Sequence, residues 1–119
     1  IKQRVRESQL KAATFVNKEL VTLYWKIGKT ISQKEKEAGW GAKIIERLSK
    51  DLSSSFPNMK GFSPRNLLYM RQFADAYPDF EIAQQPVAQI PWGHNVMILN
   101  KIKSHDQRLW YAQKTIELG

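Results

Sequence analysis

The apolar spacing between Gln9 and Glu37 is the feature that most constrains the fold of this chain. Apolar residues recur there every three or four positions, at Leu10, Ala13, Val16, Leu20, Leu23, Ile27 and Ile31. A strand would alternate with a period of two, so this spacing predicts one long helix with an apolar stripe. Gly28 lies within the run, and we expect it to let another backbone approach the helix closely.

A second helix is expected after the break at Gly39, Trp40 and Gly41. Its inward side chains would be Ile44, Ile45, Leu48 and Leu52. Phe56 precedes a proline and is therefore biased away from helical angles, so residues 57–62 are expected to form a short connection.

The third helix has the clearest start in the sequence. Ser63 is a preferred N-cap, and Pro64 suits the first helical position because its missing N–H would be unbonded there anyway. The helix should continue to about Tyr77, with an inward face made of Leu67, Met70, Phe73, Ala74 and Tyr77.

The last third of the chain is expected to form a helical hairpin. Residues 78–90 lack strand alternation and read as a loop with a short helical turn. A fourth helix should run from about Pro91 to Lys103, and Ser104 with Gln107 is a capping box that predicts a fifth. The whole chain, residues 1–119, is thus expected to be a single all-α domain of about five helices.

Composition narrows the possible functions. The chain carries a net charge of +8, which favours a polyanionic partner such as a nucleic acid. It has no cysteine, so a disulfide framework, a cysteine zinc site and a thiol nucleophile are excluded. No apolar run reaches the length of a membrane span, and we expect a cytoplasmic protein with no membrane contact.

The second and third helices together resemble a helix-turn-helix, in which a recognition helix enters the major groove of duplex DNA. Arginine, asparagine and glutamine can read base edges, an exposed leucine can contact a thymine methyl, and further cations can neutralise phosphates. The candidate nucleic-acid-binding residues are Arg65, Asn66, Leu68 and Gln72 toward the groove, and Arg71, Lys60, Lys43 and Arg47 toward phosphates. A plain helical hairpin with a solvated outer face is the alternative. Removing Arg65 and Asn66 should leave the fold intact and, if the DNA hypothesis holds, abolish DNA binding.

Other chemistry has little support in the sequence. His94 and His105 have no metal-ligand spacing with a second histidine or a carboxylate, and no acid–base pair or phosphate loop is present, so we expect no catalytic residue and no cofactor in this chain. The tryptophans are expected to be core residues and not stacking platforms for bases. For Trp40, which lies between two glycines, both roles stay open. The first helix could contact phosphates through its lysines, but self-association through its apolar stripe is favoured.

Four phrases, VNKELVTLYWKIGKTI, GWGAKIIERLSKDLSSSFPNMKGFSPRNLLYMRQF, IPWGHNVMILNKI and WYAQKTIELG, resemble the N-terminal domain of the YhcG family of bacterial proteins. The resemblance covers nearly the whole chain. It implies an all-helical module that precedes a PD-(D/E)XK nuclease-like domain, in which carboxylates and a lysine hold a divalent metal such as Mg²⁺. None of those metal ligands can be placed on this sequence, and the chain is expected to be the N-terminal part of a longer protein.

The leading hypothesis is therefore a helix-turn-helix-like module that holds double-stranded DNA for a metal-dependent endonuclease. The alternative is an oligomerisation or protein-docking module, such as a homodimer formed through the first helix, without direct DNA contact. The sequence leaves DNA against RNA open.

Overall fold

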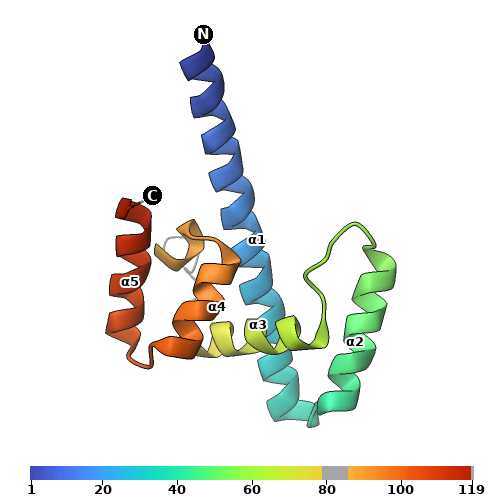
Figure 1. The fold of residues 1–119 in the computed structure, drawn as a ribbon. Helices are drawn as coiled ribbons and strands as arrows, with labels where there is room; N and C mark the ends of the chain where they lie inside the picture. Colours follow the sequence, from blue (N-terminus) through green and yellow to red (C-terminus); the bar gives the residue numbers. More distant parts are fainter. Residues whose placement is uncertain (79–85, 119) are drawn as a thin grey trace. The chain divides into compact units, whose positions relative to one another are not determined.

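The computed structural model describes residues 1–78 and 86–118, and the regular structure within them is entirely helical. In order, the elements are α1 (Lys2–Ala38), α2 (Ala42–Ser55), α3 (Pro64–Ala76), the 3-10 helix η2 (Pro86–Gln89), α4 (Trp92–Lys101) and α5 (His105–Leu118) (Figure 1). The predicted all-α class with five α-helices is confirmed for these residues. They group into two compact units, residues 24–78, and residues 1–23 with the described residues after position 85.

The helix boundaries follow the sequence signals closely. α1 begins at Lys2, earlier than the expected Gln9, because extending an existing helix through a polar stretch costs little once its nucleus has formed. The N–H of Gln107 donates to the Ser104 hydroxyl at 3.4 Å, as expected of the capping box before α5. The predicted short helical turn is η2, while residues 79–85 of the expected loop lie outside the described part of the chain.

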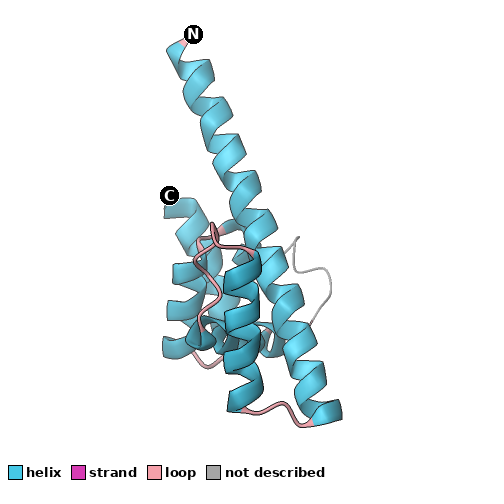
Figure 2. Cartoon of the chain, turned by 90° about the vertical axis from the view of Figure 1, so that its right-hand side faces the viewer, coloured by secondary structure: helices cyan, strands magenta, loops and turns pink. Residues whose placement is uncertain are grey.

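In the unit formed by residues 24–78, α2 runs back alongside the C-terminal part of α1 and α3 crosses α1 (Figures 1 and 2). Gly28 lies at the crossing. A Cβ atom added to Gly28 would overlap the carbonyl oxygen and carbon of Met70 in α3. Only a glycine therefore fits, and the expected close approach of a second backbone is confirmed.

The inward face of α3 supplies much of the core of this unit. The residues expected to face inward are all buried, namely Leu67, Met70, Phe73, Ala74 and Tyr77. The indole N–H of Trp25 donates to the carbonyl of Tyr77 at 2.6 Å, and the hydroxyl of Ser32 donates to the carboxylate of Asp75 at the same distance. Two side chains of α1 thus bind the C-terminal end of α3.

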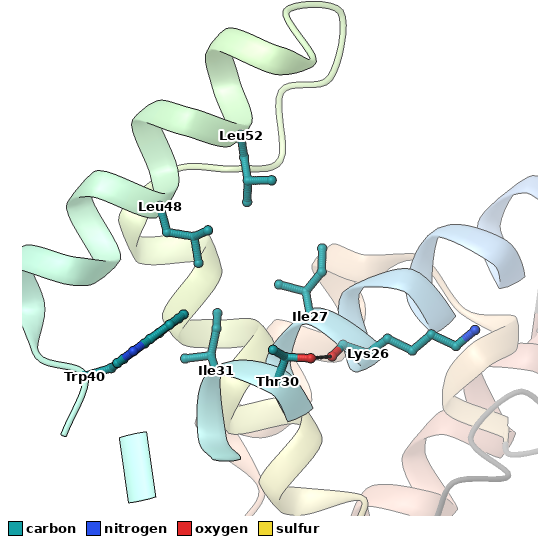
Figure 3. A pocket seen from close by; sticks show the side chains of 7 residues that line it. All are labelled: Lys26, Ile27, Thr30, Ile31, Trp40, Leu48 and Leu52. Atoms are coloured by element: carbon teal, nitrogen blue, oxygen red, sulfur yellow. Dashed lines mark hydrogen bonds between the residues drawn. The ribbon is translucent and has the colours of Figure 1, made fainter. Parts of the chain in front are cut away.

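An apolar hollow of about 270 Å³ lies between α1 and α2 (Figure 3). Ile27 and Ile31 line it from α1, and Leu48 and Leu52 line it from α2. Trp40, in the connection between the two helices, lies at its edge and is half-buried. Three of the four expected inward residues of α2 are buried or half-buried, whereas Ile44 is exposed.

In the other unit, two asparagine amides hold η2 in place. The side-chain amide of Asn95 is buried and donates to the carbonyl of Val87 at 2.8 Å, and that of Asn17 donates to the carbonyl of Ile90 at 2.9 Å. α5 packs against both η2 and α4, with Ala112 buried. In the phrase PWGHN the buried polar residue is thus the asparagine, while the neighbouring histidine is exposed.

The tryptophans do not all belong to the core. Trp25 is buried and Trp92 half-buried, but Trp110 is 56% exposed and its ring makes an edge contact with Tyr111 at 4.9 Å. The expectation that Trp110 is a core residue was wrong, because the packed side of α5 is the one that carries Ala112. None of the helices among the described residues combines the length and apolar content that a membrane crossing requires.

Replacing Gly28 with alanine should destabilise the fold strongly. The added methyl group would force α1 and α3 apart, and overpacking of this kind costs about 1–3 kcal/mol or more. Urea unfolding measures the loss. Gly93→Ala in α4 is the matched control, because nothing lies near its added Cβ, and it should be neutral or stabilising. Equal losses in the two variants would contradict this account of Gly28.

Replacing Asn95 with alanine should lower the free energy of unfolding by about 1–3 kcal/mol, because the buried carbonyl of Val87 loses its donor. Asn100→Ala, on the exposed side of the same helix, should stay within about 0.5 kcal/mol of the wild type. Thermal unfolding followed by circular dichroism compares the two. A harmless Asn95→Ala variant would show that η2 does not depend on this amide.

Candidate nucleic-acid interface

The connection before α3 is held by side-chain hydrogen bonds. The Ser63 hydroxyl caps α3 by accepting the N–H of Asn66 at 3.1 Å, as its position in the sequence predicts. The side-chain amide of Asn66 donates to the carbonyl of Gly61 at 2.7 Å, and the hydroxyl of Ser49 in α2 donates to the carbonyl of Phe62 at 2.5 Å. The N-terminal end of α3 is therefore fixed before any ligand binds.

Gly61 is required by its contact with α1. A Cβ atom added to it would overlap the hydroxyl group of Tyr24. Tyr24 is itself 5% exposed, and burial raises the pKa of its hydroxyl above the ordinary value of about 10. The hydroxyl is thus protonated at neutral pH and lies directly against the connection.

Three of the four residues predicted to face a DNA groove project from α3 into solvent. Arg65, Leu68 and Gln72 are all exposed. The guanidinium carbon of Arg65 lies 5.9 Å from the centre of the Tyr69 ring, so the ring supports the arginine on the helix surface. These three side chains share the outer face of α3 that the helical spacing predicts.

Asn66, the fourth predicted residue, has a structural task. It is half-buried, and its amide is engaged with the carbonyl of Gly61. We therefore expect removal of Asn66 to cost some stability, whereas the exposed Arg65 makes no such bond to the preceding turn. Sequence reasoning missed this because the bond runs backward from the helix into the preceding turn.

The residues predicted to contact phosphates fall into two groups. Lys43, Arg47 and Lys60 are exposed, and none of them forms an ion pair within residues 1–78 and 86–118. Arg71 is instead half-buried, and its guanidinium binds the carboxylate of Glu35 in α1 at 2.8 Å. No local pattern reveals this pair, since the two residues lie on different helices.

A hollow of about 500 Å³ adjoins the outer face of α3. Leu68 and Arg71 line it from α3, Glu46 lines it from α2, and Glu35 and Trp40 complete it. Leu68 therefore shares this hollow with two carboxylates, one of which Arg71 neutralises. At the N-terminal end of α3, Lys60 and Arg65 are exposed, and neither forms an ion pair within residues 1–78 and 86–118.

The connection between α2 and α3 runs from Phe56 to Ser63. A helix-turn-helix of the repressor type has a turn of about three or four residues, so the connection between α2 and α3 is longer than the turn of that motif. Within the described residues, no three histidine, aspartate or glutamate side chains gather closely enough to hold a metal ion.

The fold therefore defines the class of this protein. It is an all-helical module, and its second and third helices present exposed cations. Residues 1–119 match the family described as the DUF1016 N-terminal domain, and the chain belongs to that family. It is also 34% identical over 136 residues to a protein of Escherichia coli (strain K12) named "Putative nuclease YhcG". That match covers 87% of this chain and 36% of the relative, so the chain corresponds to about a third of the relative's length. No solved structure matches it.

Substitutions of the two residues at the start of α3, Arg65 and Asn66, should differ in their effect on the free energy of unfolding. Asn66→Ala should lower the free energy of unfolding by about 1 kcal/mol, because the carbonyl of Gly61 loses a hydrogen bond. Arg65→Ala should change it by less than about 0.5 kcal/mol, because the side chain is exposed. Chemical unfolding tests both. An Asn66→Ala variant as stable as the wild type would show that the hydrogen bond to Gly61 does not stabilise the start of α3.

Proposed function

We propose that this chain is the DNA-binding module of a metal-dependent endonuclease and that α2 and α3 act as a helix-turn-helix-like pair on duplex DNA. The observation that carries the proposal is the exposure of Lys60 and Arg65 at the N-terminal end of α3, where neither forms an ion pair within the described residues. A helix N-terminus attracts phosphate by itself, and two cations beside it strengthen that attraction. The name of the Escherichia coli relative supports a nuclease as the setting.

In this proposal the outer face of α3 reads the groove. Arg65 would bind guanine through O6 and N7, Gln72 would bind adenine, and Leu68 would contact a thymine methyl. Asn66 keeps its bond to Gly61 and positions Arg65, so it contributes to DNA binding through the shape of the helix start.

The remaining cations would serve the phosphate backbone. Lys43, Arg47 and Lys60 are free to do so within the described chain. Arg71 would have to give up Glu35 to reach a phosphate, so we assign it a weaker part. Hydrolysis itself would belong to a PD-(D/E)XK domain with a divalent metal such as Mg²⁺, in a cytoplasmic protein.

A second candidate function is oligomerisation or protein docking without direct DNA contact. Apolar side chains exposed along the first half of α1, among them Phe15 and Val16, favour it. The two functions are compatible, because dimers commonly bind paired DNA half-sites.

Affinity for a DNA duplex, measured against salt concentration, tests the first proposal. The logarithm of the affinity should fall as the logarithm of the salt concentration rises, by about 0.9 per unit for each phosphate contact. Arg65→Ala and Lys60→Ala should each weaken binding and reduce this slope by roughly one contact.

Lys103→Ala is the matched control, because it removes one exposed positive charge between α4 and α5. It should leave the affinity close to that of the wild type. Absence of binding at low salt would overturn the proposal, and an equal effect of Lys103→Ala would reduce it to unspecific charge attraction.

A further inference from the structure

The first half of α1 exposes more large apolar side chains than a solvated helix needs. Val5 is 51% exposed, Phe15 64%, Val16 63% and Leu23 40%, and Ala12 is exposed as well. Contiguous apolar surface of this kind usually marks a site of interaction.

Apart from Phe15, which lies roughly 80° to one side, these side chains lie on a face of α1 that is turned away from the rest of its unit. At about 100° per residue, Val5, Ala12, Val16 and Leu23 fall within about 20° of one line along the helix. Asn17 and Val21, which face η2 and the core, lie roughly 120–160° around the helix from that line. Val16 and Leu23 belong to the apolar stripe predicted from the sequence, and both are exposed.

The line has the spacing of a coiled-coil seam. Gln9, Val16 and Leu23 recur at intervals of seven, and Val5, Ala12 and Glu19 form the second series between them. All six residues are exposed. Glu19 is the one formal charge among these six seam positions, so the partner must offer it a polar group.

We infer that this seam, residues 5–23 of α1, binds the same seam of a second copy of the chain in antiparallel orientation. In an antiparallel pair centred at position 14, Val5 faces the partner's Leu23, and Ala12 faces the partner's Val16. Glu19 then faces the amide of the partner's Gln9. The two-fold axis repeats each of these residue pairs once, so each pair occurs twice in the dimer.

The polar positions decide the orientation. A parallel pair in register would place Glu19 against the partner's Glu19 and bring two like charges together in the seam. The antiparallel pair replaces that repulsion with a hydrogen bond between a carboxylate and an amide. It also matches apolar positions with apolar positions throughout.

The same complementarity points to a second copy as the occupant. A two-fold interface uses one surface on both subunits, so that surface must complement itself after rotation. Residues 5–23 meet this condition, because the single acidic seam residue and the seam amide exchange places. The inference does not depend on DNA binding by α2 and α3.

Sedimentation equilibrium of the 119-residue chain tests the association. The wild type should show a dimer that dissociates on dilution. Val16→Lys should raise the dimer dissociation constant by roughly tenfold or more, because it places an ammonium group in the apolar seam. Thr14→Lys adds the same charge on the opposite side of α1 and should leave the dimer unchanged. A wild type that stays monomeric, or equal effects of the two lysines, would overturn the inference.

Disulfide trapping tests the orientation, because the chain contains no cysteine of its own. A mixture of Ala12→Cys and Val16→Cys should form a disulfide-linked heterodimer under mild oxidation, since the two positions face each other in the antiparallel pair. Ala12→Cys alone should crosslink poorly. Stronger crosslinking of Ala12→Cys alone than of the mixture would show a parallel pair and overturn the proposed register.

Discussion

The contact between the backbones of α1 and α3 at Gly28 and Met70 is the constraint on which the unit of residues 24–78 depends. Two helices can touch at their backbones only where no side chain intervenes. The contact brings the inner face of α3 fully into the core and places Trp25 within hydrogen-bonding distance of the carbonyl of Tyr77. A single hydrogen atom in place of a methyl group thus determines how deeply α3 is buried.

The parts of the fold that follow from neighbouring residues could be predicted from the sequence. Ser63, Pro64 and the inward face of α3 are local features, because capping and helical spacing involve residues within a few positions. The clamp of Asn17 and Asn95 on η2 could not be predicted. Its acceptors are backbone carbonyls, which carry no signal in side-chain identity, and one donor lies far away in the sequence.

The candidate site divides in the same way. Exposure of Arg65, Leu68 and Gln72 follows from the helical spacing of α3. The pairing of Arg71 with Glu35 depends on where α3 crosses α1, so it becomes visible only in three dimensions. An arginine that looks available in the sequence is therefore partly occupied. The phrase GFSPRN likewise contains residues that form the start of the helix. It also contains Arg65, whose exposed side chain takes no part in forming that start.

The contact of Gly61 with the hydroxyl of Tyr24 has a consequence for how the two positions can vary. A larger residue at position 61 becomes possible only if the ring at position 24 shifts or is replaced by a smaller side chain, because the added Cβ would overlap both the hydroxyl and the ring carbon that carries it. Substitutions at the two positions are thus coupled, although one lies in a helix and the other in a turn. Among related sequences, this pair should change together or not at all.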